Sequence, residues 1–277
     1  MFYREVIRMR RLFLIVNFVA LAALAIGVGG AMAQSSSKSS SSASSTDGVA
    51  EVRLGGFVFE AGARLALEIV HEGDLDCFPS PVVVERLQLV AADDAVLFEE
   101  TYAPAIDAAA WIGRVRLVDA SGALLPVGVY EVAISTSAGS FIAEIEVAAT
   151  SSLSGLGRYS ASASVCGYSL CVYRLVSEAD DGASLALRVG DRVMVELEGN
   201  ATTGYTWTNA MEVEYAVLRE IQESEYRAAS DLLGAPGVFL FRYVAVDVGP
   251  QTFRFIYHRP WESVEPLKTV QFTVHIS

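Results

Sequence analysis

Positive charge is scarce in this sequence. Twenty Lys and Arg residues stand against 33 Asp and Glu residues, and the formal net charge is −13. A surface this acidic repels phosphate backbones, so the composition argues against a nucleic-acid partner. It indicates a soluble protein and says little else about what the protein binds.

Residue types suited to catalysis are also few. The three His residues are His71, His258 and His275. The chain has neither a Gly-x-Ser-x-Gly elbow nor a His-Glu-x-x-His pair nor a phosphate-binding loop. His71 lies in a loop-like stretch, and His258 borders a loop motif described below. Because no nucleophile, base and orienting group occur together, we predict that the protein is not an enzyme and needs no cofactor.

Cysteine is nearly absent, with three residues in 277. Cys166 and Cys171 are five positions apart, so they could close a small local disulfide or remain two thiols. Cys77 would then be single, and we expect it to be a small buried apolar residue. Two cysteines without a second pair or a nearby His cannot form a closed zinc site, so no metal is predicted.

The chain has one long apolar run, and it lies at the N-terminus. Basic residues at positions 4–11 precede an apolar stretch over 12–30, and Ala31-Met32-Ala33 has the pattern of a cleavage site. Residues 1–33 are therefore predicted to be a signal peptide, and the protein to be exported: periplasmic, at the cell surface or secreted. The alternative is an uncleaved membrane anchor, since the run is long enough to span a bilayer.

Residues 34–49 are rich in Ser and are predicted to be flexible, because they have little apolar area to bury. They would be either a spacer or a remnant behind the cleavage site. Residues 50–148 form a first predicted β domain, with alternating apolar residues at 64–69 and 130–135. The Gly-x-Tyr-x-Val sequence at 128–132 resembles bacterial immunoglobulin-like modules, which implies no function.

A Ser-, Gly- and Ala-rich stretch supports a linker over residues 149–171. Residues 172–277 form a second predicted β domain, with alternating segments at 193–197 and 253–257. Residues 212–230 are rich in Glu, as in a helix, but their apolar residues alternate and favour a strand. The short strands and turn signals together predict an all-β protein with two sandwich domains.

Three loop motifs follow strands or precede them in the second domain. They are Asn-Ala-Thr-Thr-Gly-Tyr-Thr-Trp at 200–207, Gly-Ala-Pro-Gly at 234–237 and Arg-Pro-Trp at 259–261. Through these motifs the last 105 or so residues resemble the chagasin family of cysteine protease inhibitors. That family has an Asn-Pro-Thr-Thr-Gly-Tyr-x-Trp loop, a Gly-x-Gly-Gly loop and an Arg-Pro-Trp loop in the same order.

The resemblance implies an immunoglobulin-like fold and a reversible inhibitor whose three loops occlude the active-site groove of a papain-family cysteine protease. The protease-binding residues that it implies are Asn200, Thr202, Thr203, Gly204, Tyr205, Gly234, Gly237, Arg259, Pro260 and Trp261. The sequence departs from the family at Ala201, which replaces Pro, and at Pro236, which replaces Gly. Ala201 should loosen the first loop, and Pro236 removes one backbone N–H donor from the second.

The residue types suit this role without the family name. Small residues and Gly204 permit close approach of backbone to a narrow groove, while Trp and Arg are frequent at the centre of interfaces. We expect Tyr205 and Trp207 to anchor the first loop to the core. The alternative function is a cell-surface binding or adhesion module with the same type of fold. Clustering of the three loops at one end, with Trp261 exposed, would favour the inhibitor.

Overall fold

The computed structural model describes residues 42–46, 49–71, 81–149, 164–165, 168–211, 216–230 and 232–277. All of them belong to one compact unit, Ser39–Ser277. The predicted signal peptide at 1–33 lies outside the described residues. Within the described part, no helix is both long and apolar enough to cross a membrane.

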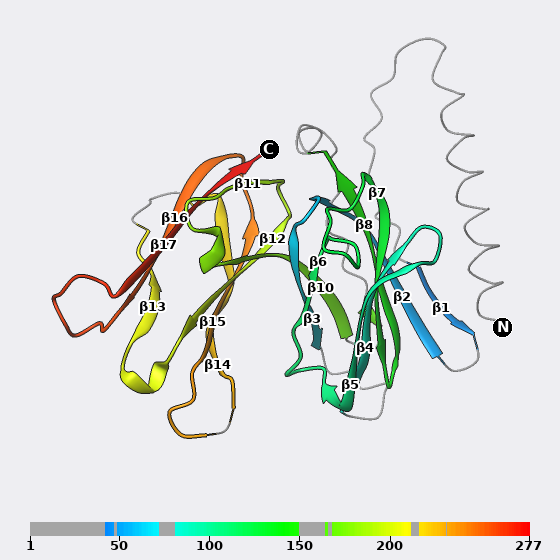
Figure 1. Cartoon of the computed structure of the whole chain (residues 1–277), viewed down its shortest axis with the longest axis horizontal. Coiled ribbons are helices and arrows are strands. Elements are labelled where there is room, and N and C mark those ends of the chain that lie inside the picture. Colours follow the sequence, from blue (N-terminus) through cyan, green and yellow to red (C-terminus); the bar gives the residue numbers. More distant parts are fainter. Residues whose placement is uncertain are drawn as a thin grey trace, which may run out of the picture. The chain divides into compact units, whose positions relative to one another are not determined.

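The described residues of this unit form three β-sheets (Figure 1). The first sheet has six strands, in the order β1-β2-β8-β7-β4-β5. Their bounds are β1 Ser42–Thr46, β2 Val49–Glu60, β4 Val83–Ala91, β5 Val96–Asp107, β7 Gly128–Thr136 and β8 Gly139–Ala148. Strands β7 and β8 form an antiparallel hairpin, and β2 pairs with β8 in parallel.

The second sheet has seven strands and continues through both predicted domains. Its main order is β14-β15-β12-β10-β3-β6, and β9 pairs with β10. The bounds are β3 Arg64–His71, β6 Gly113–Arg116, β9 Ser164–Val165, β10 Tyr168–Ser177, β12 Arg192–Gly199, β14 Leu218–Ala228 and β15 Gly237–Ala245. Residues 168–174 of β10 pair antiparallel with β3, and residues 174–177 pair in parallel with β12. One strand therefore joins the two halves of the unit.

The third sheet has four strands, in the order β11-β17-β16-β13. Its bounds are β11 Ser184–Leu187, β13 Thr206–Asn209, β16 Gly249–His258 and β17 Lys268–Ile276. Two short 3-10 helices, η2 Glu178–Asp180 and η3 Ala201–Thr203, connect strands in this half.

Two apolar cores lie between the sheets. One joins the six-stranded sheet to β3, β6 and β10, and contains Leu65, Leu87 and Ile145. The other joins the four-stranded sheet to β12 and β15, and is rich in aromatic rings, with Phe253 stacked on Phe272 at 5.5 Å between centroids. In β7, β16 and β17, alternate residues are buried and face these cores, as period-2 patterning requires. The predicted all-β sandwich class is confirmed.

Three predictions about single segments can be compared with these strands. The alternation in 212–230 is realised as a strand over Leu218–Ala228, while residues 212–215 lie outside the described part. Ser42–Thr46, predicted to be flexible, instead forms a strand paired with β2, because a sheet edge satisfies backbone groups whatever the side chains are. The predicted boundary at 171/172 falls inside β10, so residues 168–171 are strand and not linker.

Candidate functional site

Three loops emerge at the same end of the second half of the unit (Figure 1). We define loop 1 as residues 200–205, after β12; loop 2 as residues 229–236, between β14 and β15; and loop 3 as residues 259–267, between β16 and β17. Residue 231 of loop 2 lies outside the described part. The end of β12 pairs with the start of β15 at Gly199 and Gly237, which brings loops 1 and 2 together.

Loop 1 is a compact turn held by its own side chains. The Oδ1 atom of Asn200 accepts hydrogen bonds from the backbone N–H of Thr202, at 3.1 Å, and from its hydroxyl, at 2.6 Å. The hydroxyl of Thr203 donates to the Asn200 carbonyl at 2.6 Å. Gly204 closes the turn in the left-handed region, with φ of 82°. These contacts order the loop although Ala201 replaces the family's proline.

Asn200 also connects loop 1 to loop 2. Its side-chain Nδ2 donates to the carbonyl oxygen of Gly234 at 2.9 Å. Gly234 has φ of 81°, a conformation that favours glycine, and its carbonyl can therefore point toward loop 1. Asn200 thus caps the turn of loop 1 and is hydrogen-bonded to the backbone of loop 2.

Arg259 connects loop 1 to loop 3. Its Nη2 donates to the Thr203 carbonyl at 3.2 Å, and its guanidinium lies 4.6 Å from the centroid of the Tyr205 ring. The Nη1 atom donates to Glu262 within loop 3 at 2.9 Å. The hydrogen bond with Glu262 raises the pKa of Arg259 above its ordinary value. Arg259 therefore fixes the relative position of loops 1 and 3.

Trp261 projects from loop 3 and remains 69% exposed. Its ring borders Gly204, where a Cβ atom would lie 2.7 Å from Trp261 Cη2. The three loops thus lie together and Trp261 is exposed, which is the arrangement that separates the inhibitor from the binding-module alternative.

An aromatic base supports loop 1. Trp207 is buried and its Nε1 donates to the Glu198 carbonyl at 3.0 Å. The rings of Tyr205 and Trp207 each lie 5.2 Å from that of Tyr257, whose hydroxyl accepts from the Asn200 N–H at 2.8 Å. Tyr205 and Trp207 thus anchor the loop to the core, as expected from their spacing.

Comparison with known proteins identifies this half of the molecule. Residues 186–276 match the family model described as "Chagasin family peptidase inhibitor I42". These residues form a chagasin-family domain. The match covers all three loops and about a third of the chain, and it excludes the first β domain. The family is one of peptidase inhibitors, which confirms the prediction that the protein is not an enzyme.

Curated relatives match the same region. Amoebiasin-2 of Entamoeba histolytica is 26% identical over 113 residues, which are 40% of this chain and 92% of the relative. Chagasin of Trypanosoma cruzi is 29% identical over 104 residues, which are 36% of this chain and 94% of the relative. The chagasin-like domain is therefore similar to these relatives over nearly their whole lengths.

Solved structures give a weaker likeness. A cysteine protease inhibitor from Entamoeba histolytica has a TM-score of 0.33 and 28% identity, covering 37% of this chain and 94% of its own. The structure of PbICP-C in complex with falcipain-2 has a TM-score of 0.25 and 16% identity, covering 44% of this chain and 95% of that chain. These TM-scores are low, so the assignment rests on the sequence match.

Gly237, predicted among the binding residues of the chagasin-like domain, is buried at the start of β15. A Cβ atom there would lie 2.2 Å from the Arg227 carbonyl oxygen and 2.8 Å from the Tyr226 ring. Glycine is therefore required for the close approach of β14 and β15 at this position. Pro236 uses its carbonyl oxygen within the hairpin, where it accepts from the Ala229 N–H at 2.8 Å.

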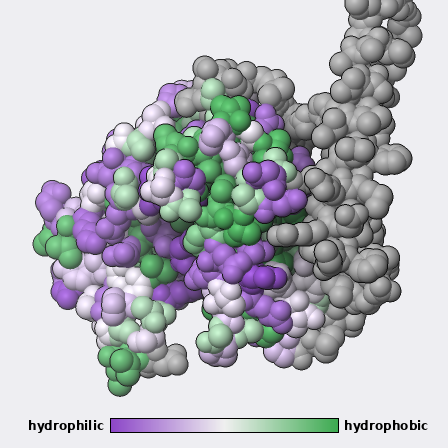
Figure 2. All heavy atoms as spheres, turned by 45° about the vertical axis from the view of Figure 1, so that its right-hand side comes forward, coloured by the Kyte–Doolittle hydropathy of each residue, from purple (hydrophilic) through white to green (hydrophobic). Residues whose placement is uncertain are grey.

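Loops 2 and 3 carry exposed apolar residues that the motifs did not reveal. Leu232 of loop 2 is 77% exposed and Leu233 is fully exposed, and in loop 3 Val264 and Leu267 are exposed beside Trp261. Figure 2 shows apolar side chains at the tip of the loop that projects at the lower left. The periodicity of strands says nothing about loop tips, but a Leu-Leu pair between two turn signals could have indicated this surface.

The remaining predictions concern Cys and His residues. Cys171 is buried in β10 and accepts a hydrogen bond from Arg192 Nη1 at 2.8 Å. Cys77 and Cys166 lie outside the described residues, so the disulfide stays a prediction. His258 lies beside loop 3 and contacts the Thr208 hydroxyl at 3.1 Å through Nε2. Among the described residues, no cluster of His, Cys, Asp and Glu suits a metal ion.

Proposed function

We propose that the protein is an exported, reversible inhibitor of papain-like cysteine proteases, and that loops 1, 2 and 3 occlude the active-site groove. The observation that supports this proposal is that hydrogen bonds join three loops at one end of a chagasin-family domain. Asn200 connects loop 1 to loop 2 and Arg259 connects loop 1 to loop 3. A protease would then bind one ordered surface, and that surface would lose little conformational entropy on association.

Loop 1 has the properties of a plug that resists cleavage. A protease groove accepts a substrate backbone in extended form, whereas residues 201–203 form a 3-10 turn that ends at the left-handed Gly204. The small side chains of Thr202 and Thr203 are exposed and permit close approach to a narrow groove. Their hydroxyls are bonded within the loop, which keeps the turn from opening into a substrate-like strand.

Loops 2 and 3 supply apolar surface on either side of this plug. Leu233 of loop 2 and Trp261 of loop 3 are both largely exposed. Burial of a leucine side chain contributes about 1.5–3 kcal/mol, and tryptophan is among the residues most often dominant at interfaces. A small polar centre with apolar flanks therefore supports tight binding in a groove with apolar walls.

The predicted binding residues divide into two roles in this proposal. Thr202, Thr203, Gly204, Pro260 and Trp261 form the contact surface. Asn200, Tyr205, Gly234, Gly237 and Arg259 hold the loops in position through the contacts described above. Substitution of the second group should lower affinity through disorder of the loops.

Papain and a fluorogenic substrate test the inhibitor directly. The purified protein should inhibit papain at nanomolar to micromolar concentration, and activity should return after dilution of the complex. Trypsin, which lacks a catalytic cysteine, serves as the control and should not be inhibited. Absence of papain inhibition at micromolar concentration would favour the alternative, a cell-surface binding or adhesion module. Papain activity that fails to return on dilution would contradict reversibility.

Export is proposed from residues 1–33. The mature protein should begin at Gln34, and mass spectrometry of its N-terminus after expression in an exporting host would detect this. A chain that retains Met1 and sediments with membranes would instead indicate an uncleaved anchor.

A further inference from the structure

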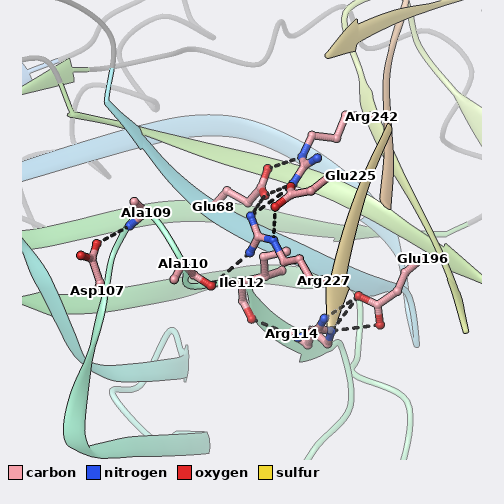
Figure 3. A network of polar contacts seen from close by, with 10 residues as sticks. All are labelled: Glu68, Asp107, Ala109, Ala110, Ile112, Arg114, Glu196, Glu225, Arg227 and Arg242. Carbon is pink, nitrogen blue, oxygen red and sulfur yellow. Dashed lines mark hydrogen bonds and ion pairs between the residues drawn. The ribbon is translucent and has the colours of Figure 1, made fainter. Parts of the chain in front are cut away.

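The β14–β15 hairpin, which carries loop 2, contacts the first β domain through charged side chains (Figure 3). Arg242 of β15 donates to both carboxylate oxygens of Glu68 in β3, at 2.9 and 2.6 Å. The two side chains are only 2% and 8% exposed, respectively. Glu225 of β14 accepts from the same guanidinium at 2.9 Å. One buried cation thus joins the first domain to both strands of the hairpin.

Burial alone would lower the pKa of Arg242, but its hydrogen bonds and charge interactions with Glu68 and Glu225 are stronger and raise it. The Nη1 atom of Arg242 has no hydrogen-bond partner among the described residues. The cation therefore depends on these two carboxylates, and loss of either one would leave a buried charge poorly compensated.

Arg227 makes a second connection, closer to loop 2. Its Nη1 donates to the carbonyl oxygen of Ala110 at 3.1 Å, in the segment that precedes β6 of the first domain. Its Nε donates to Glu225 at 2.7 Å, and its Nη2 lies 3.8 Å from Glu68. Only Ala228 separates Arg227 from the first residue of loop 2.

These contacts require the seven-stranded sheet to curl. Strands β14 and β6 are its opposite edges, and in a flat sheet they would lie about 24 Å apart at roughly 4.8 Å per strand. The hydrogen bond from Arg227 to Ala110 spans this separation, so the face between them is concave. A third apolar cluster lines that face; its buried members are Ala66, Cys171, Tyr173, Leu175, Met194 and Leu240.

Successive side chains of β14 point to opposite faces, so the strand contacts the first domain on one face and loop 2 on the other. Glu225 and Arg227 point toward the first domain, and Tyr226 between them contacts loop 2. The Tyr226 hydroxyl donates to the Ala235 carbonyl at 3.2 Å, and its ring lies 4.8 Å from that of Phe239. A strand held on one side by ion pairs therefore supports the loop on its other side.

We propose that the first β domain, residues 50–148, is a brace that holds loop 2 in its protease-binding position, with Arg227 and Glu68 as positioning residues. This inference rests on the proposed inhibitory function. Without the brace the hairpin would have to be ordered during binding, and that cost would appear as faster dissociation of the complex.

The full-length protein allows a test with matched variants. Arg227→Met keeps the aliphatic stem and removes the links to Ala110 and Glu225, while the Glu68–Arg242 pair remains. Arg219→Met, on the exposed part of the same strand, is the control. We expect Arg227→Met to dissociate from papain about tenfold faster, the size of one lost hydrogen bond to a charged group. Arg219→Met should match the parent, and Arg227→Lys should recover part of the loss.

A double-mutant cycle separates positioning from general instability. If Arg227 acts through loop 2, its effect on dissociation should largely disappear in a Leu233→Ser background and persist in a Trp261→Ala background. Equal effects in both backgrounds, or an unchanged rate for Arg227→Met with an inhibitory parent, would overturn the brace and leave the proposed function intact. A parent that does not inhibit papain would overturn both.

Discussion

The ring of Trp261 lies so close to Gly204 that a Cβ atom at position 204 would come within 2.7 Å of its Cη2 atom. The two residues belong to loops separated by more than fifty residues in sequence. Gly204 also has φ of 82°, which disfavours any residue with a side chain. Position 204 therefore couples the turn of loop 1 to the placement of the exposed tryptophan.

Gly204→Ala should weaken papain inhibition by tenfold or more, because the methyl group displaces Trp261 and strains the turn by about 1–2 kcal/mol. Gly182→Ala is the matched control. Gly182 has φ of 76°, and a Cβ atom there meets nothing within 4 Å. Both variants should lose similar stability in thermal unfolding, but only Gly204→Ala should lose inhibition. Equal inhibition constants for the two variants would show that loop 1 does not approach the protease.

The bulkier Gly204→Glu should abolish inhibition and leave the fold intact. Full inhibition by this variant would show that loop 1 does not enter the groove.

Trp261→Ala should reduce affinity for papain by about 2 kcal/mol or more, as expected for a tryptophan that becomes buried in an interface. Its free energy of unfolding should change by less than about 0.5 kcal/mol, because the side chain is largely exposed. Trp207→Ala, which removes a buried ring, should do the reverse and destabilise the fold first. Inhibition titrations and urea unfolding of both variants distinguish the two roles.

Leu233→Ser should lower affinity by about 1–2 kcal/mol if loop 2 buries this side chain against the protease. Val248→Ser provides the control, since Val248 is also exposed but lies in the turn between β15 and β16, at the opposite end of the domain. Neither substitution should change thermal stability. An unaltered inhibition constant for Leu233→Ser would exclude the tip of loop 2 from the interface.

Acid should weaken the ion-pair network of the brace. Burial tends to raise the pKa of Glu225, but hydrogen bonds from Arg227 and Arg242 dominate and lower it below its ordinary value of 4.5. A lowered pKa in the folded state means that the stabilisation is complete above pH 4.5 and is lost as the pH falls through the folded pKa. The Tm of Glu225→Gln should therefore lie below that of the parent at pH 7 and converge with it at lower pH. A constant difference across this range would contradict the shift.

Much of the end formed by loops 1, 2 and 3 could be predicted from the sequence, because each motif is a short continuous stretch. The turn at 200–205 depends on Asn200 and Gly204, whose side-chain capping and backbone freedom are properties of the residues themselves. The motifs left open whether Trp261 is exposed or buried, and its place in the loop after β16 leaves it exposed. The burial of Gly237 could not be predicted, since it depends on the packing of Tyr226 against it.

Long-range features could not be predicted in the same way. The alternation in β10 indicates a strand but cannot say that it pairs with both β3 and β12, since pairing partners are distant in sequence. Glu68 and Arg242 are 174 residues apart and each looks like an ordinary surface charge. Their burial follows from the curl of the sheet, which no local pattern encodes.

The most direct measurement is binding of the full-length protein to papain whose groove is either open or filled by a covalent peptide-like inhibitor of the catalytic cysteine. We expect tight, saturable binding to open papain and no measurable binding to the filled enzyme, because loops 1, 2 and 3 need the same groove. Equal binding to both forms would contradict occlusion of the active site.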